Sequence, residues 1–291
     1  MFEGVLPALI TPFSEDNTID KAGLKKNIDF VEKGGVSGVV ACGTTGESAT
    51  LSTNEHKELI NATLDCASVP VIAGTGSNNT AEAVELSKYA ADAGVDGILV
   101  ISPYYNKPND AGLIRHFTTI AENADVPIIL YNVPSRTAQN IPLDVIVELS
   151  KIENIVAIKE ASGDLDKITR IIENTQDEEL AVLSGEDGLT FPIVALGGSG
   201  VISVAANIVP DKMVELVNAT AKGDLDVARQ RHYEMAPLIR ALFCETNPIP
   251  VKHAMGLMGL AAGHLRLPLA PISSENEQVL INALKEIGCI E

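Results

Sequence analysis

The stretch Ile155–Ser162 places a lysine where a buried strand would otherwise be apolar. Ile155, Ala157 and Lys159 fall on one face, because side chains alternate along a strand. A fully buried lysine is rare, since an unpaired charge in an apolar site is costly. The amine avoids that cost by losing its proton, and a neutral amine is a nucleophile. The alternatives are a lysine whose ammonium reaches water and one that pairs with Glu160.

Polar residues also follow most of the other apolar runs that we interpret as strands. If the strands are parallel, their carboxyl ends meet at one rim, which is where barrel enzymes place their active sites. Hydroxyls, tyrosines, one arginine and one lysine would then gather there. The segments at this rim are Gly43–Ser48, Gly74–Asn78, Pro103–Asn106, Tyr131–Arg136, Lys159, Ser184–Asp187 and Ala206–Asn207.

The elements that position these residues alternate between short apolar runs and amphipathic stretches, which predicts an α/β fold. The apolar runs are uniformly hydrophobic, as expected when both faces of a sheet are covered. Eight strands with intervening helices favour a (β/α)8 TIM barrel over an open doubly wound sheet, and no GxGxxG follows the first strand. The predicted strands are Val5–Ile10, Gly38–Gly43, Pro70–Gly74, Gly97–Pro103, Pro127–Asn132, Ile155–Ala161, Leu180–Ser184 and Gly200–Ala205.

The strand pattern stops after Gly223, and three helices follow it. We therefore predict a catalytic barrel over residues 1–223 and a helical extension over residues 224–291. Prolines interrupt the helical pattern of the extension, and no linker separates the extension from the barrel. Its predicted helices are Asp224–Cys244, Pro250–Leu260 and Ser273–Ile287.

Composition excludes several classes of function. The 39 acidic and 21 basic residues give a net charge of −18, which argues against a nucleic-acid partner. No apolar run is long enough to cross a membrane, and the N-terminus does not resemble a secretory signal, so we expect a cytoplasmic protein. The four cysteines form no CxxC, which predicts free thiols and no metal cluster; they are Cys42, Cys66, Cys244 and Cys289.

The rim carries no HxH motif and no carboxylate triad, which disfavours metal-dependent chemistry. A buried lysine beside tyrosine and threonine instead suits carbonyl chemistry through a Schiff base, with hydroxyls relaying protons. Arg136 is suited to hold a carboxylate with two hydrogen bonds, although a surface salt bridge is its simpler interpretation. Gly43–Gly46 and Gly74–Ser77 lack P-loop spacing, so they are tight turns or, for Thr44 and Thr45, an anion site.

Four separated motifs resemble the dihydrodipicolinate synthase family. The resemblance extends from Gly4 to about Leu267, nearly the whole chain. It implies a pyruvate-dependent class I aldolase, built as a barrel with a helical C-terminal domain and assembled as a dimer of dimers, a homotetramer. The motifs are Gly43-Thr-Thr-Gly-Glu-Ser48, Tyr104-Tyr-Asn106, Tyr131-Asn-Val-Pro-Ser-Arg136 and Ile158-Lys-Glu-Ala161.

The resemblance implies that pyruvate and L-aspartate 4-semialdehyde are the substrates and that no metal or organic cofactor takes part. Lys159 would form the Schiff base, and Thr44, Tyr131 and Tyr105 would relay protons, with Tyr105 supplied by a neighbouring subunit. Thr45 would hold the pyruvate carboxylate and Arg136 that of the semialdehyde. Gly185 and Ile202 would line the pocket with backbone groups. The product would enter lysine biosynthesis.

Some members of the family are inhibited by lysine. The matching positions here are Ser48, Ala49, His56, Asn78, Glu82 and Tyr104. Thr53 stands where inhibited members often carry a histidine, so feedback inhibition stays open. The alternative for His56 is an exposed helix residue.

Two other functions remain as alternatives. A sister aldolase acting on N-acetylneuraminate or a 2-keto-3-deoxy sugar acid would share the lysine and tyrosine, but a polyol substrate offers Arg136 no carboxylate. A non-catalytic barrel that binds a small acid would have no need of Lys159, Tyr131, Tyr105 and Thr44 together.

Overall fold

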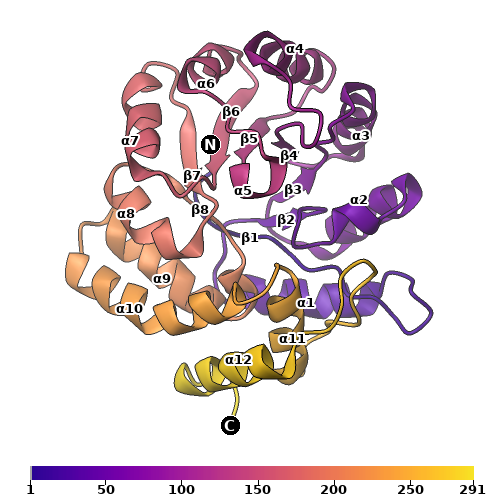
Figure 1. Ribbon diagram of the computed structural model, residues 1–291, viewed down its shortest axis with the longest axis vertical. Coiled ribbons are helices and arrows are strands. Elements are labelled where there is room, and N and C mark those ends of the chain that lie inside the picture. The colour runs from indigo at the N-terminus through magenta and orange to yellow at the C-terminus, as the bar shows by residue number, and fades with distance from the viewer. Residues whose placement is uncertain (1) are drawn as a thin grey trace.

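A ring of parallel strands surrounded by helices forms the centre of the molecule, as Figure 1 shows for the computed structural model, which describes residues 2–291. The strands in this range are β1 (Gly4–Pro7), β2 (Val39–Ala41), β3 (Val71–Gly74), β4 (Gly97–Ile101), β5 (Ile128–Asn132), β6 (Ile155–Glu160), β7 (Ala181–Ser184) and β8 (Gly200–Ser203). They pair in the order β1-β8-β7-β6-β5-β4-β3-β2.

The ring closes between β1 and β2. A parallel bridge joins Ala8 to Val40, and the Leu9 N–H donates to the Val40 carbonyl at 2.9 Å. The N–H of Ser37 similarly donates to the carbonyl of Val5 at 2.9 Å. The predicted α/β fold and its (β/α)8 TIM barrel are therefore confirmed.

The barrel helices form the outer layer, and the short helix α5 (Pro134–Thr137) follows β5 on the chain. Pro134 opens α5 at a position where its missing N–H costs nothing. The others are α1 (Lys21–Lys33), α2 (Thr53–Cys66), α3 (Thr80–Ala93), α4 (Asp110–Ala121), α6 (Leu143–Ser150), α7 (Leu165–Asn174), α8 (Thr190–Ala195) and α9 (Pro210–Ala221). The 3-10 turns are Ser48–Thr50, Asp187–Leu189 and Ala205–Asn207.

Each strand buries both of its faces, which explains the uniformly apolar runs. In β5, Ile128 and Leu130 pack outward against the helices, whereas Ile129 and Tyr131 belong to the cluster inside the barrel. That inner cluster comprises Leu6, Ala8, Val40, Ile72, Leu99, Ile129, Tyr131, Val133, Ala157, Ala161, Ala181, Leu183 and Ile202.

All eight predicted strands overlap the observed ones, but several were predicted to extend too far at their carboxyl ends. The first was expected to reach Ile10, and β1 ends at Pro7. Leu9 and Ile10 are nonetheless buried. Both belong to the core cluster that the strands share with the helices, so burial continues past the last strand bond and hydrophobicity alone does not mark where a strand ends.

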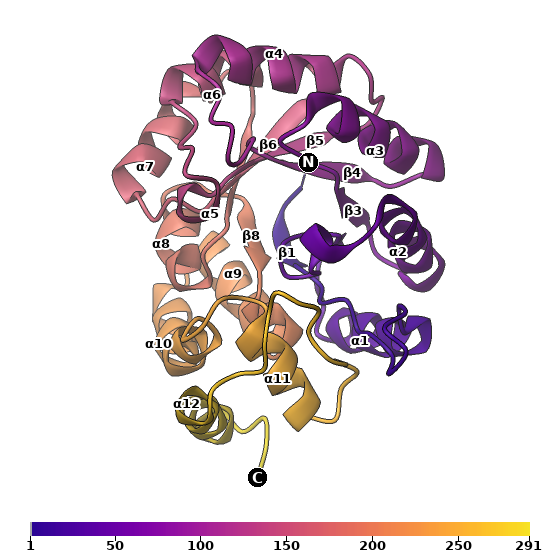
Figure 2. The same cartoon turned by 45° about the vertical axis from the view of Figure 1, so that its right-hand side comes forward.

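Three helices follow α9 and gather at one end of the molecule with the C-terminus (Figure 2). They are α10 (Leu225–Leu242), α11 (Ile249–Leu257) and α12 (Ser274–Glu286). The loop after α11 is tied to α1, where the Asn27 side-chain amide donates to the Ala261 carbonyl at 2.6 Å. The segment between α10 and α11 reaches the rim of the barrel, where the Asn247 side-chain amide donates to the Thr45 hydroxyl at 3.0 Å.

Candidate active site

Lys159 lies on the inner face of β6 and is only 7% exposed. It is in register with Tyr131 of β5 and Leu183 of β7, and its Nζ lies 4.3 Å from the centroid of the Tyr131 ring. The neighbours on the same face, Ala157 and Ala161, are small and leave room around the amine. The alternative with the ammonium in water is therefore wrong.

Glu160 does not pair with Lys159, because successive residues of a strand face opposite ways. It is buried on the outer face of β6, where its two oxygens accept from the Asn132 amide at 3.0 and 2.9 Å. Lys167 lies 3.6 Å from the same carboxylate. The ion-pair alternative for Lys159 is therefore wrong as well.

A cavity of about 120 Å³ surrounds the amine at the carboxyl ends of the strands. Five residues expected at the site line it: Thr44, Thr45, Tyr131, Arg136 and Gly185. Glu186 and Asn247 line it too, although no role was predicted for either. The predicted gathering of strand-end residues around Lys159 thus occurs within a single chain.

The turn after β2 presents two threonines to this cavity. Its backbone is held by the bond from the Gly46 N–H to the Gly43 carbonyl and by the Thr11 hydroxyl, which donates to the Gly46 carbonyl at 2.6 Å. Glu47 then takes a left-handed conformation, with φ of 56°. A residue from outside the turn therefore helps to hold it, because Thr11 belongs to the loop after β1.

The Glu47 carboxylate anchors the same turn to the C-terminal helices. It is buried and accepts from Lys252 Nζ at 2.7 Å and from the Arg266 N–H at 3.0 Å. Lys252 is also buried, and its ammonium donates to the carbonyls of Thr11 and His264 at 2.9 and 2.7 Å. No role was predicted for Lys252 from the sequence, although a lysine in the mostly apolar stretch Ile249–Met255 is the same kind of signal that marked Lys159.

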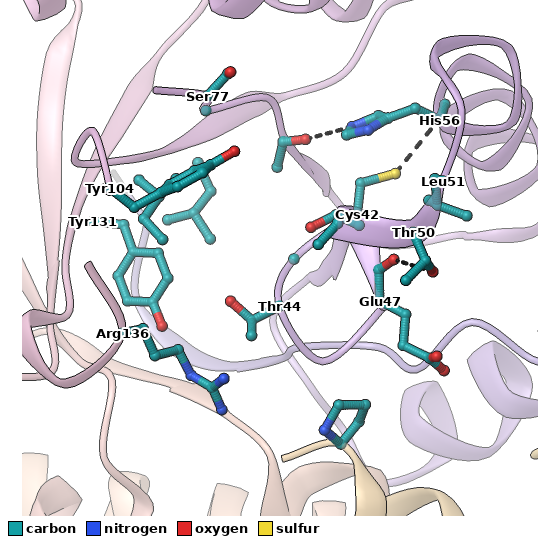
Figure 3. A pocket seen from close by; sticks show the side chains of 18 of the residues that line it. Cys42, Thr44, Glu47, Thr50, Leu51, His56, Ser77, Tyr104, Tyr131 and Arg136 are labelled. Atoms are coloured by element: carbon teal, nitrogen blue, oxygen red, sulfur yellow. Dashed lines mark hydrogen bonds between the residues drawn. The ribbon is translucent and has the colours of Figure 1, made fainter. Parts of the chain in front are cut away.

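Tyr131, Thr44 and Arg136 face one another across the pocket (Figure 3). Arg136 is exposed at the mouth, and within the described chain it forms no ion pair. Its guanidinium donates to the main-chain carbonyl of Asn247 at 3.1 Å. The surface salt bridge considered for Arg136 is thus wrong, and most of its donors remain free for a ligand.

Gly185 packs directly against the lysine. A Cβ at this position would lie 2.6 Å from the Ala161 Cβ and 3.1 Å from the Lys159 Cε. The next residues, Glu186 and Asp187, are acidic. Burial raises the pKa of both carboxyls, and the nearby Lys159 opposes the shift in each case. Only glycine fits at position 185, because a Cβ there would crowd Ala161 and Lys159.

A second cavity of about 430 Å³ adjoins the first and shares Thr44, Tyr131 and Arg136 with it. Five residues expected at the regulatory site line it, and Thr53 lines it too; the five are Ser48, Ala49, His56, Glu82 and Tyr104. Asn78 lies outside this lining, and its carbonyl accepts from the Asn106 amide at 2.9 Å.

His56 is buried rather than exposed, so the alternative of an exposed helix residue is wrong. Its Nε2 lies 2.7 Å from the Gly74 carbonyl, which is the bond drawn in Figure 3. Burial lowers the pKa of the imidazole. The Gly74 carbonyl therefore fixes the ring at the wall of the larger cavity in the tautomer that carries its proton on Nε2.

Two expected residues are not brought to the Lys159 cavity. Tyr105 is 90% exposed, has φ of 69° and lines neither cavity. Ile202 is buried inside the barrel, in register with Leu6. Tyr105 was expected to complete the site of a neighbouring subunit, and its own chain leaves it exposed to solvent.

Among residues 2–291, no group of three or more His, Cys, Asp or Glu is arranged to hold a metal ion. Over the same range, no helix combines the length and apolarity that a membrane crossing requires.

Comparison with known proteins decides the family. The model of the dihydrodipicolinate synthetase family matches residues 1–287. The chain belongs to this family. A curated member from Methanococcoides burtonii, a 4-hydroxy-tetrahydrodipicolinate synthase, is 69% identical over 291 residues, which is the whole of both chains.

Solved members of the dihydrodipicolinate synthetase family share the whole fold. The chloride-inhibited dihydrodipicolinate synthase of Acinetobacter baumannii, solved in complex with pyruvate, is 42% identical, with a TM-score of 0.97 and full coverage of both chains. The lysine-bound enzyme of Cyanidioschyzon merolae is 38% identical, with a TM-score of 0.96 and 99% of each chain covered. The resemblance noted in the sequence is confirmed at the level of family and fold.

Proposed function

We propose that the chain is a lyase that condenses pyruvate with L-aspartate 4-semialdehyde to 4-hydroxy-tetrahydrodipicolinate, a step of lysine (diaminopimelate) biosynthesis. The observation that carries the proposal is the buried amine of Lys159, which opens into a small cavity beside Tyr131 and Thr44. Relatives that carry this activity as their name match the chain from end to end.

The reaction proceeds through covalent chemistry on Lys159. The amine adds to the C2 carbonyl of pyruvate and water leaves, which gives an iminium ion. Loss of a proton from C3 yields an enamine, whose carbon attacks the aldehyde of the second substrate. The amino group of that substrate then attacks the iminium carbon, closes the ring and releases Lys159. No metal or organic cofactor takes part.

The other site residues divide into proton carriers and carboxylate ligands. Tyr131 and Thr44 carry protons to and from the reacting atoms, since their hydroxyls face the same cavity. Thr45 holds the pyruvate carboxylate, and Arg136 at the mouth holds that of the semialdehyde. The backbone of Gly185 completes the pocket. Thr45 is buried, whereas Arg136 is exposed at the mouth, which orders the two substrates with pyruvate innermost.

Tyr105 completes the relay in a neighbouring copy of the chain. Its ring is 90% exposed and carries no partner within its own described chain, which supports this role. The working form is a homotetramer in the cytoplasm, each chain consisting of a barrel over residues 1–223 and an extension over residues 224–291. Neither nucleic acid nor membrane is a partner.

Reduction with borohydride in the presence of labelled pyruvate tests this function. Peptide mapping should place the label on Lys159, and the same preparation should consume aspartate 4-semialdehyde. Absence of an adduct on Lys159 would overturn the Schiff-base proposal. An adduct without consumption of the semialdehyde would favour the sugar-acid aldolase instead.

The larger cavity is a candidate site for lysine as a feedback inhibitor. Glu82 offers a carboxylate to an ammonium group, and Ser48, Ala49, His56 and Tyr104 line the same cavity. The Cyanidioschyzon merolae relative binds lysine. Titration of lysine into the assay tests the idea, with Glu82→Gln as the variant that should abolish any inhibition. Activity that is unchanged by millimolar lysine would exclude it.

A further inference from the structure

Asn247 links the two residues proposed to hold substrate carboxylates. It lies between α10 and α11, is 6% exposed and lines both cavities. Its side-chain Nδ2 donates to the Thr45 hydroxyl oxygen at 3.0 Å. Its main-chain carbonyl accepts from the Arg136 guanidinium at 3.1 Å. One residue of the C-terminal segment therefore contacts both carboxylate ligands, through different atoms.

The direction of the bond to Thr45 matters, because a hydroxyl has a single proton to donate. Nδ2 occupies an acceptor position of the Thr45 oxygen and leaves the O–H of Thr45 free. Within the described chain no acceptor takes that proton. The O–H can therefore point into the cavity, where a substrate carboxylate would accept a hydrogen bond from it.

The environment of Asn247 indicates that neither packing nor anchorage of the segment explains an asparagine at this position. Its Oδ1 is buried and has no hydrogen-bond partner in the described chain. A buried amide that leaves an acceptor unsatisfied is costly, so a leucine or alanine would be the cheaper residue for packing alone. Anchorage of the segment does not require it, because Lys252 and Glu47 already tie the neighbouring helix to the threonine turn.

We propose that Asn247 is a positioning residue for keto-acid binding, which acts by presenting the Thr45 hydroxyl as a hydrogen-bond donor to the carboxylate of the first substrate. This inference rests on the proposed function. The contact with Arg136 uses the main chain, so substitution of the Asn247 side chain leaves it in place. The side chain therefore acts on the first substrate, and the backbone on the second.

The test is a double-mutant cycle measured by steady-state kinetics with both substrates varied. Asn247→Ala should raise the KM for pyruvate roughly 5- to 10-fold, the effect of one hydrogen bond between neutral groups, with little change in kcat or in the KM for the semialdehyde. Thr45→Val should raise the same constant. The double variant should be no worse than Thr45→Val alone, because both changes remove one interaction.

Thr45→Ser supplies the matched control, since it keeps the hydroxyl and should preserve the effect of Asn247→Ala. Asn247→Leu, which fills the volume without a donor, replaces the alanine variant if that variant folds poorly. Additive effects of Asn247→Ala and Thr45→Val, or an equal rise in both KM values, would overturn the proposal. Failure of the proposed function is distinct, because the wild-type protein would then form no borohydride-trapped pyruvate adduct.

Discussion

Among the described residues, two lysines are almost completely buried, and their surroundings differ in how many of their donors are used. Lys252 Nζ donates to three acceptors: the Glu47 carboxylate and the carbonyls of Thr11 and His264. Lys159 Nζ faces the Tyr131 ring at 4.3 Å and forms no hydrogen bond or ion pair with a described residue. A lysine that uses all three donors is committed to structure, whereas one that uses none keeps its nitrogen available for a ligand.

The two environments also differ in their carboxylates. Burial lowers the pKa of Lys252, but the bond to Glu47 opposes that shift and keeps the ion pair together. Two carboxyl groups, those of Glu186 and Asp187, lie near Lys159, but neither bonds to its amine. Asp187 accepts instead from the N–H groups of Val204 and Ala205 at 3.1 and 2.9 Å. Burial alone therefore does not identify a reactive lysine, and the satisfaction of its donors is the sharper criterion.

The largest contrast is expected from replacing each lysine by methionine. Lys159→Met should reduce the rate by about four orders of magnitude or more, since it removes the proposed nucleophile. Its thermal midpoint should stay the same or rise, because an unpaired amine is exchanged for an apolar chain of similar length. Assay and calorimetry of one preparation measure both. Residual activity within a hundred-fold of wild type would break the distinction between the two lysines.

Lys252→Met should show the reverse pattern, with a loss of stability of about 3–5 kcal/mol. The cause is the Glu47 carboxylate, which would stay buried at 0% side-chain exposure without its cation. Urea unfolding monitored by circular dichroism measures the loss. The double variant Glu47→Gln/Lys252→Met removes both charges and should recover much of it. A loss below about 1 kcal/mol in the single variant would show that the pair contributes little.

Gly185→Ala should disturb Lys159 without removing it. The added Cβ would lie 2.6 Å from the Ala161 Cβ and 3.1 Å from the Lys159 Cε, so both neighbours must give way, and a small misplacement of a reacting group costs roughly 10- to 100-fold in kcat. Gly188→Ala is the matched control, because its Cβ would meet nothing closer than the Ile239 Cγ2 at 3.9 Å. Equal kinetic effects of the two substitutions would mean that contact with Lys159 is not the cause.

The sequence supports the barrel and the position of Lys159 for physical reasons. Parallel strands covered on both faces are apolar throughout, and one lysine in such a run is conspicuous. The same reasoning predicted which segments meet at the rim, because the carboxyl ends of parallel strands share one edge. Arg136 and Thr44 could be placed near Lys159 before any coordinates were known.

The long-range contacts that support the site could not be predicted in this way. Asn247 bonds to Thr45 across 202 positions, and Lys252 bonds to Glu47 across 205. No periodicity or local motif encodes such a pairing, which depends on where the C-terminal helices pack. The alternative of an exposed His56 was wrong because the Gly74 carbonyl, which accepts from its ring, belongs to β3, whereas His56 belongs to α2.

The smallest expected effect concerns Glu186, which borders Lys159 but does not pair with it as Glu47 pairs with Lys252. Burial, helped by Asp187, raises the pKa of Glu186 above its ordinary value of 4.5. Below pH 4.5 the carboxyl is protonated in both the folded and unfolded states, so it does not lower the stability of the fold. As pH rises through the raised folded pKa, the folded state must bury a charge that the unfolded state exposes to water, so stability is lost.

Glu186→Gln should therefore be more stable relative to wild type at pH 7 than at pH 4, as measured by urea unfolding at both values. Glu173→Gln, which alters an exposed carboxylate on α7, is the control and should show no such difference between the two pH values. If Glu186 instead held Lys159 as Glu47 holds Lys252, the glutamine variant would lose stability at pH 7. That result would remove the distinction between the committed and the available lysine.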